Sequence, residues 1–103
     1  MLDMTNMTRT AAALGNESRV SILKWLRDPK EHFPPQSQGD VERDGVCGIF
    51  IAQKLGVTPA TASEHLKILA NAKLVTSTRL GKWTDFRRTQ QGLDDFIELL
   101  KGL

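Results

Sequence analysis

The sequence has a single cysteine and no long hydrophobic run. Because Cys47 has no second cysteine to pair with, an internal disulfide is excluded. No stretch is long and apolar enough to span a bilayer. The N-terminus also lacks the basic stretch followed by an apolar one that marks a signal peptide. We therefore expect a cytoplasmic protein.

No arrangement of residues that usually carries catalysis stands out either. The chain contains no glycine-rich phosphate loop, and its two histidines do not form a plausible Ser-His-Asp grouping. We expect a protein that is not an enzyme and that needs no cofactor.

The charge is small in total but unevenly distributed. The 103 residues fit one domain, taken here as 1–103, with a net charge of only +2. Residues 28–44 hold five acidic and two basic side chains, whereas residues 54–88 hold seven basic and two acidic ones. This separation indicates one basic face of the kind that a phosphate backbone requires, although an ordinary solvated surface is the alternative.

Two helices are expected in the first quarter of the chain. The first covers about 3–13, and Asn16 can cap the second, which ends at Arg27 because Pro29 follows. The apolar stripe of the second helix is expected to comprise Val20, Leu23 and Leu26, with Ile22 and Trp25 beside it. The polar, acidic stretch 28–46 then reads as a long loop.

A helix-turn-helix is expected over residues 51–72. A short third helix covers about 48–55, and Gly56 suits a left-handed cap at its end. Thr58 and Pro59 suit the start of a fourth helix. The expected inward side chains are Ile49, Ala52 and Leu55 on the third helix and Ala62, Leu66 and Leu69 on the fourth.

Two strands and a final helix complete the chain. Residues 74–79 and 83–89 favour extended structure, with Leu80-Gly81-Lys82 as the turn, so that 74–89 forms a basic hairpin, or wing. We expect a mainly α-helical fold with a small β-hairpin, arranged as a winged helix-turn-helix.

The fourth helix is expected to read double-stranded DNA. Its exposed side chains are short, which allows a close approach to base edges in the major groove, and the wing adds cations for phosphates. The candidate DNA-binding residues are Thr58, Pro59, Ala60, Thr61, Ser63, Glu64, His65, Lys67, Arg79 and Lys82.

Three stretches in the right order resemble the ArsR/SmtB family of repressors. "ALGNESRVSILKWL" (13–26) is similar to the family's second helix, "IAQKLGVTPATASEHLKILANAKLV" (51–75) to its helix-turn-helix and "TRLGKWTDFRRT" (78–89) to its wing. The resemblance covers roughly residues 10–100. It implies a homodimeric repressor that binds an inverted-repeat operator and dimerises through its first and last helices.

The amphipathic final helix agrees with that expectation. Its apolar stripe lies at a chain end and needs a partner, although packing against its own domain is the alternative. The expected dimer residues are Met7, Leu93, Phe96, Ile97 and Leu100.

The usual metal sites of the family are not expected here. The arsenic- and cadmium-binding members carry C-x-C-D-L, but the matching stretch 45–49 has only Cys47. The zinc and nickel members use histidine on the final helix, and 90–103 contains none. His32 and Asp40 could hold a metal ion, but a solvated loop is the favoured interpretation of this stretch. His65 suits an orienting hydrogen bond better than a metal bond. Cys47 is either a redox sensor or a buried structural residue, so the expected inducer is a small molecule or an oxidant.

Two alternatives remain at this point. A winged helix can bind protein instead of DNA, and Glu64 lends this reading support because a carboxylate near phosphates is unfavourable. Alternatively, the repressor is a redox switch that uses Cys47.

Overall fold

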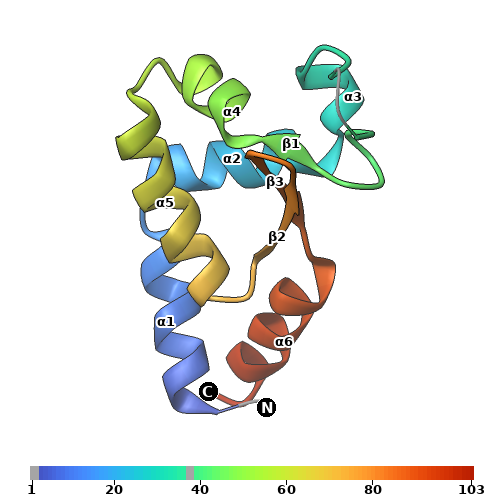
Figure 1. Ribbon diagram of the computed structural model, residues 1–103. Coiled ribbons are helices and arrows are strands. Elements are labelled where there is room, and N and C mark those ends of the chain that lie inside the picture. Colours follow the sequence, from blue (N-terminus) through green and yellow to red (C-terminus); the bar gives the residue numbers. More distant parts are fainter. Residues whose placement is uncertain (1–2, 37–38) are drawn as a thin grey trace.

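A computed structural model describes residues 3–36 and 39–103 as six helices and three strands around one core (Figure 1). The elements in chain order are α1 (Met4–Leu14), α2 (Glu17–Arg27), α3 (Pro29–His32), β1 (Val46–Cys47), α4 (Gly48–Leu55), α5 (Pro59–Asn71), β2 (Val75–Leu80), β3 (Trp83–Arg88) and α6 (Gln90–Lys101). Over these residues, no helix combines the length and apolar character needed to cross a membrane. The fold is mainly helical, as the sequence predicted.

Local capping explains where the helices begin and end. The Asn16 side chain accepts a hydrogen bond from the amide of Arg19, and Thr58 accepts one from the amide of Thr61 at the start of α5. Gly56 has a φ of 73° and ends α4 in the left-handed conformation. The Asn16 cap lies at the expected start of α2, and the Gly56 and Thr58 caps lie at the expected turn between α4 and α5.

The buried faces of two helices differ from the predicted ones. On α2 the buried residues are Ile22, Leu23 and Leu26, whereas Val20 is 37% exposed. On α4, Ile51 is fully buried and Ile49 is 38% exposed. The expected inward positions of Val20 and Ile49 were therefore wrong, whereas Leu23 and Leu26 on α2 and Ala52 on α4 are buried as predicted. The stripe of α5 was correct, with Ala62, Leu66 and Leu69 buried.

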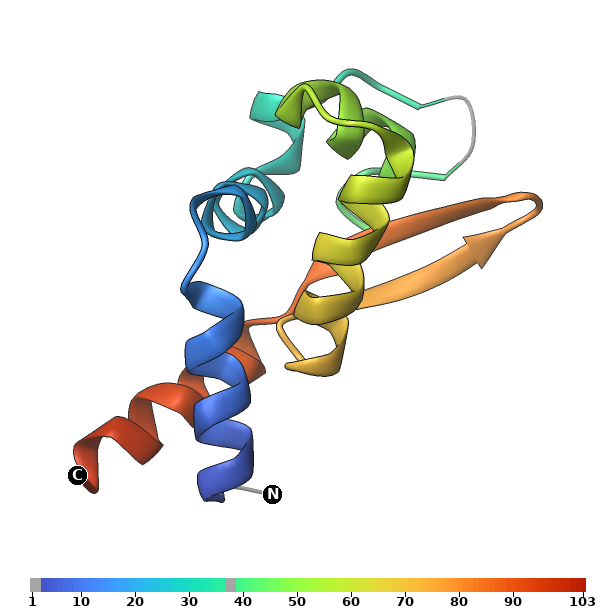
Figure 2. The ribbon, with the colours of Figure 1, turned by 90° about the vertical axis from the view of Figure 1, so that its left-hand side faces the viewer.

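The sheet has three antiparallel strands in the order β1-β3-β2. The hairpin of β2 and β3 turns at Gly81, whose φ is 62°, and pairs Leu80 with Trp83. Figure 2 shows this hairpin extending away from the helices. The short strand β1, which the sequence did not reveal, adds to the other edge of β3 by pairing Val46 with Phe86 and Cys47 with Asp85.

The segment 28–46 is not the featureless loop that its composition indicated. It begins with the helical turn α3 and ends in β1, and residues 37 and 38 lie outside the described part. Phe33 and Val41 are each only 6% exposed and belong to the hydrophobic core. The segment is therefore anchored by apolar side chains at two points.

The final helix lies beside the first one at one end of the molecule (Figures 1 and 2). Thr89 ties the start of α6 to the end of α5 by donating its hydroxyl to the carbonyl oxygen of Lys73 at 2.7 Å. Both helices keep apolar side chains in solvent, since α6 has no fully buried residue.

Candidate nucleic-acid interface

The amino end of α5 presents the short side chains that the sequence assigned to DNA reading. Thr58 fixes the first turn, since its Oγ1 accepts from the amide of Thr61 at 3.2 Å. Pro59 occupies the first helical position, where the missing amide costs nothing. The exposed candidates on this surface are Thr58, Pro59, Ala60, Thr61, Ser63, Glu64 and Lys67. Their roles toward DNA remain predictions.

The α4 helix holds α5 in place through a tight turn. The amide of Val57 donates to the carbonyl oxygen of Ala52 at 3.1 Å. The opposite face of α5 buries Leu66 and Leu69 in the core. The exposed face of α5 therefore lies opposite a buried one, and its side chains are outside the core.

His65 differs from its neighbours because it is half-buried and already hydrogen-bonded. Its Nδ1 lies 3.2 Å from Nη1 of Arg19, on α2. Because an arginine only donates, Nδ1 accepts and the neutral ring carries its proton on Nε2. The structure thus supplies the orienting hydrogen bond expected for His65, and its partner Arg19 was not identified from the sequence.

The wing places two exposed cations near its tip. Arg79 donates from Nε to the carbonyl oxygen of Gly81 at 2.8 Å, which orients the side chain across the turn. The Nζ of Lys82 lies 5.2 Å from the centre of the Trp83 ring. Arg87, by contrast, is committed to the base of the wing, because its Nη1 donates to the carbonyl oxygen of Arg43 at 2.7 Å.

An open groove of about 480 Å³ separates α5 from the wing. Ser63 and Lys82 lie on its two sides, and Cys47 lines its floor at the start of α4. Cys47 is 8% exposed and carries a free thiol. The groove therefore has residues of both α5 and the wing in its lining.

Gln36 ties the segment 28–46 to the sheet. Its Oε1 accepts from the amide of Cys47 at 2.7 Å, and its Nε2 donates to the carbonyl oxygen of Gly45 at 3.2 Å and to Oδ2 of Asp85 at 3.4 Å. Asp85 is only 2% exposed. Burial raises the pKa of Asp85, the hydrogen bond from Gln36 opposes that shift, and the charge of Asp44 adds to it.

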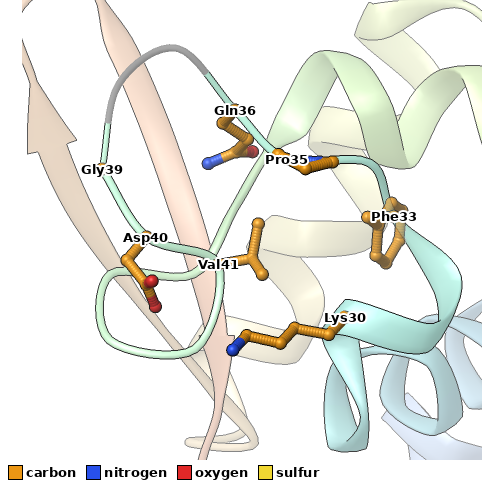
Figure 3. A pocket seen from close by; sticks show the side chains of 7 residues that line it. All are labelled: Lys30, Phe33, Pro35, Gln36, Gly39, Asp40 and Val41. Atoms are coloured by element: carbon orange, nitrogen blue, oxygen red, sulfur yellow. The ribbon is translucent and has the colours of Figure 1, made fainter.

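The same segment encloses a hollow of about 380 Å³ (Figure 3). Lys30 and Phe33 line the hollow from the beginning of the segment, and Asp40 and Val41 line it from the later part of the segment. The polar groups already have partners: Lys30 pairs with Glu42 at 2.7 Å, and Asp40 accepts from the amides of Glu42 and Arg43. Two of the apolar residues, Phe33 and Val41, belong to the core.

The predicted dimer residues lie on the α1 and α6 end of the molecule. Ile97 and Leu100 are 47% and 44% exposed, and Met7, Leu93 and Phe96 are half-buried. Phe96 lines a small hollow between α1 and α6 together with Asn6 and Thr10. The exposed apolar stripe is consistent with a partner, but the pairing remains a prediction.

Within residues 3–36 and 39–103, no three His, Cys, Asp or Glu side chains are placed to hold a metal ion. His32 and Asp40, the pair considered from the sequence, are not part of such a group. That the protein binds no metal ion stays a prediction.

A family profile and a curated relative both match transcriptional regulators. Residues 47–77 match the profile of the bacterial regulatory protein arsR family. Over 89 residues the chain is 42% identical to the uncharacterized HTH-type transcriptional regulator YbzH of Bacillus subtilis, which covers 86% of this chain and 89% of the relative.

Two solved structures show the same fold. One is an ArsR-like transcriptional regulator from Rhodococcus sp. RHA1, with a TM-score of 0.68, 22% identity and coverage of 94% of this chain and 77% of that one. The other is the homodimeric winged helix-turn-helix DNA-binding domain of Mb0332 from Mycobacterium bovis, with a TM-score of 0.66, 24% identity and coverage of 95% and 78%.

Proposed function

The chain belongs to the ArsR family of DNA-binding winged helix-turn-helix transcriptional regulators, and we propose that it acts as a homodimeric repressor on an inverted-repeat operator. The observation that carries the proposal is the amino end of α5. There, exposed short side chains begin at a fixed cap beside a wing with exposed cations. The dimer part is supported by the exposed apolar stripe of α6 and by the homodimeric assembly of the Mycobacterium bovis relative.

In this proposal each protomer places α5 in a major groove and its wing along the adjacent backbone. Ala60, Thr61, Ser63 and Glu64 read base edges, and Arg79 and Lys82 neutralise phosphates. Two protomers related by a two-fold axis then require two half-sites in inverted orientation. Members of this family are transcriptional regulators and not enzymes, which favours DNA binding over the protein-binding alternative.

Selection of binding sites from a random duplex pool tests the proposal directly. We expect the purified chain to enrich two inverted half-sites separated by a fixed number of base pairs, and to bind them less tightly as salt rises. Enrichment of a single, unrepeated site, or complexes containing one protomer per duplex, would contradict the dimeric repressor.

Repression itself is tested on a reporter gene placed downstream of the selected site. Expression of the chain should lower reporter output, and a variant that loses site binding should restore it. An increase in output on expression of the chain would instead identify an activator.

A redox inducer has one structural observation in its favour, because Cys47 lines the groove between α5 and the wing. Oxidation to a sulfenic acid would add bulk and polarity where Leu66 and Phe86 also lie. However, Cys47 is buried, with 8% of the residue exposed, which slows reaction of its thiol with solutes. We therefore propose a signal that is neither an oxidant nor a metal. Site binding should survive dilute hydrogen peroxide as well in the native chain as in Cys47→Ser.

A further inference from the structure

Arg19 occupies a position that is unfavourable for its own helix. It lies in the first turn of α2, where free amides give the helix a positive end that repels a cation. The side chain instead reaches the last turn of α1. Its Nε donates to the carbonyl oxygen of Ala13 at 2.8 Å, and its Nη2 donates to that of Ala12 at 3.2 Å. These carbonyls form the negative end of α1, so Arg19 stabilises α1 from outside.

The same guanidinium also contacts the reading helix. Its Nη1 donates to Nδ1 of His65, which follows the exposed Ser63 and Glu64 on α5. A guanidinium is planar, and its donors point in fixed directions. One rigid group therefore connects the end of α1 to the middle of α5, across a separation of 46 residues between Arg19 and His65.

The hydrophobic packing of α5 lacks such direction. Leu66 and Leu69 hold α5 in the core by hydrophobic packing, which is not directional and tolerates small rotations of a helix. Hydrogen bonds to a charged planar donor restrict both distance and angle. Arg19 is thus a directional link between α1 and α5.

We propose that Arg19, acting through His65, is a positioning residue that sets the half-site spacing that the dimer reads. The proposal rests on the homodimeric function argued above. In that dimer α1 faces the partner protomer, whereas α5 faces DNA. A rotation of α5 relative to α1 occurs in both protomers and moves the two reading helices in opposite directions along the duplex. The angle held by Arg19 therefore determines the distance between the two half-sites.

The first test measures the contact in the free protein, without DNA. The chain has two histidines, His32 and His65, so the imidazole ¹⁵N spectrum contains few signals. Arg19→Met should change the ring nitrogen shifts of His65, because Nδ1 loses its donor, and should leave those of His32 in place. Arg27→Met removes the same charge from an exposed position of the same helix and should change neither. An unchanged His65 signal in Arg19→Met overturns the proposal.

The second test measures spacing preference directly. The probes are duplexes that carry the selected half-sites at the best spacing and at one or two base pairs more or fewer. The native chain and Arg27→Met should lose about tenfold or more in affinity when one base pair is inserted. Arg19→Met and His65→Leu should lose about tenfold at the best spacing and bind all spacings within about threefold of one another.

Three further variants separate positioning from general damage. The double variant Arg19→Met/His65→Leu should bind no worse than either single one, because both remove the same contact. His65→Asn keeps an acceptor oxygen close to the position of Nδ1 and should retain the spacing preference. If Arg19→Met does not fold, Arg19→Lys keeps the charge without the planar fork and should show the same flattened preference.

The contrary outcomes are distinct. If Arg19→Met keeps the native spacing preference, the positioning role of Arg19 is overturned, but the homodimeric function is not. An equal loss on random-sequence duplex, with a smaller salt dependence, would make Arg19 a phosphate contact instead. A native chain without any spacing preference would overturn the homodimeric function on which the spacing role rests.

Discussion

At the scale of single residues, Thr61 and Glu64 offer the sharpest test of DNA reading. Both are exposed on the amino half of α5 and do not contribute to the core. Thr61→Ala should lower affinity for the selected site roughly tenfold and affinity for random DNA very little, since a good direct base contact contributes about 1–3 kcal/mol of discrimination. Gel shifts on the two duplexes measure the difference, and an equal loss on both would show that Thr61 contacts only phosphate.

Glu64 has two readings that predict opposite results. If its carboxylate accepts from a cytosine amino group, Glu64→Ala relaxes specificity at one base pair. If it repels phosphate, Glu64→Ala tightens binding to every sequence. We expect the first result, because the neighbouring Ser63 and His65 leave Glu64 as the longest acceptor on this face. Site selection repeated with the variant distinguishes the two.

Asp85 predicts an unusual dependence of stability on pH. Burial raises the pKa of this carboxyl above its ordinary value of 3.8, so the folded chain holds the proton more tightly than the unfolded chain does. The free energy of unfolding therefore falls as the pH rises from 3.8 through the folded pKa. Asp85→Asn should be more stable than the native chain at neutral pH, and the difference should disappear at acidic pH. Thermal unfolding across the pH range measures it.

Asp44 provides the control of opposite sign. Its hydrogen bond from Arg43 lowers the pKa of its carboxyl, so its stabilising effect is present above 3.8 and is lost as the pH falls through the folded pKa. Asp44→Asn should therefore weaken the fold at neutral pH. A stabilising effect of Asp44→Asn, or a destabilising one of Asp85→Asn, would contradict these assignments.

At the scale of the elements, Gly92 shows how tightly α6 is fixed to its neighbour. A Cβ at this position would lie 2.2 Å from the carbonyl oxygen of Lys73, the residue that leaves α5 with a φ of 61°. Gly92→Ala should lower the free energy of unfolding by about 1–3 kcal/mol and displace α6. Gly102→Ala, at the other end of the helix, would place its Cβ 3.5 Å from the nearest atom and should be neutral. Chemical denaturation compares the two.

The wing predicts a different signature, which appears in salt dependence and not in stability. Arg79→Ala and Lys82→Ala should each weaken binding to all sequences about equally and reduce the salt slope by up to about one unit. The matched control is Arg87→Ala, because Arg87 is bound to the carbonyl oxygen of Arg43. A change in sequence preference without a change in slope would assign these side chains to base reading.

Helix boundaries could be predicted because they depend on adjacent residues. Asn16, Gly56 and Thr58 act on atoms within a few positions of themselves, so each cap was visible in the sequence. Burial of Val20 and Ile49 was predicted wrongly because both helices are short and apolar on more than one side, and only the tertiary fold selects the buried face. The strand β1 was missed because it has two residues and depends on pairing with β3, which lies about 40 residues further along the chain.

In the candidate site too, features that depend on adjacent residues could be predicted, and contacts between distant residues could not. The exposed surface of α5 was predictable from helical periodicity alone. The contacts of Arg19 with His65 and of Gln36 with Asp85 were not, because they join residues 46 and 49 positions apart. No local pattern indicates such pairs.

At the scale of the whole molecule, the exposed stripe on α6 predicts the assembly. Ile97→Glu would place a charge in the proposed apolar seam and should convert the dimer to monomer at micromolar concentration. Gln91→Glu adds the same charge in the first turn of α6, away from the stripe, and should stay dimeric. Analytical ultracentrifugation measures both, and a dimeric Ile97→Glu would place the seam elsewhere.

The separation of the two faces of α5 has a consequence for evolution and design. The core uses Ala62, Leu66 and Leu69, whereas reading is assigned to exposed side chains that lie outside the core. New operator preferences can therefore arise by substitution at Ala60, Thr61, Ser63 and Glu64 with little penalty in folding. A duplicated copy of this gene could acquire a separate set of targets while keeping the same scaffold. For the same reason, a library randomised at these four positions should consist mainly of folded proteins.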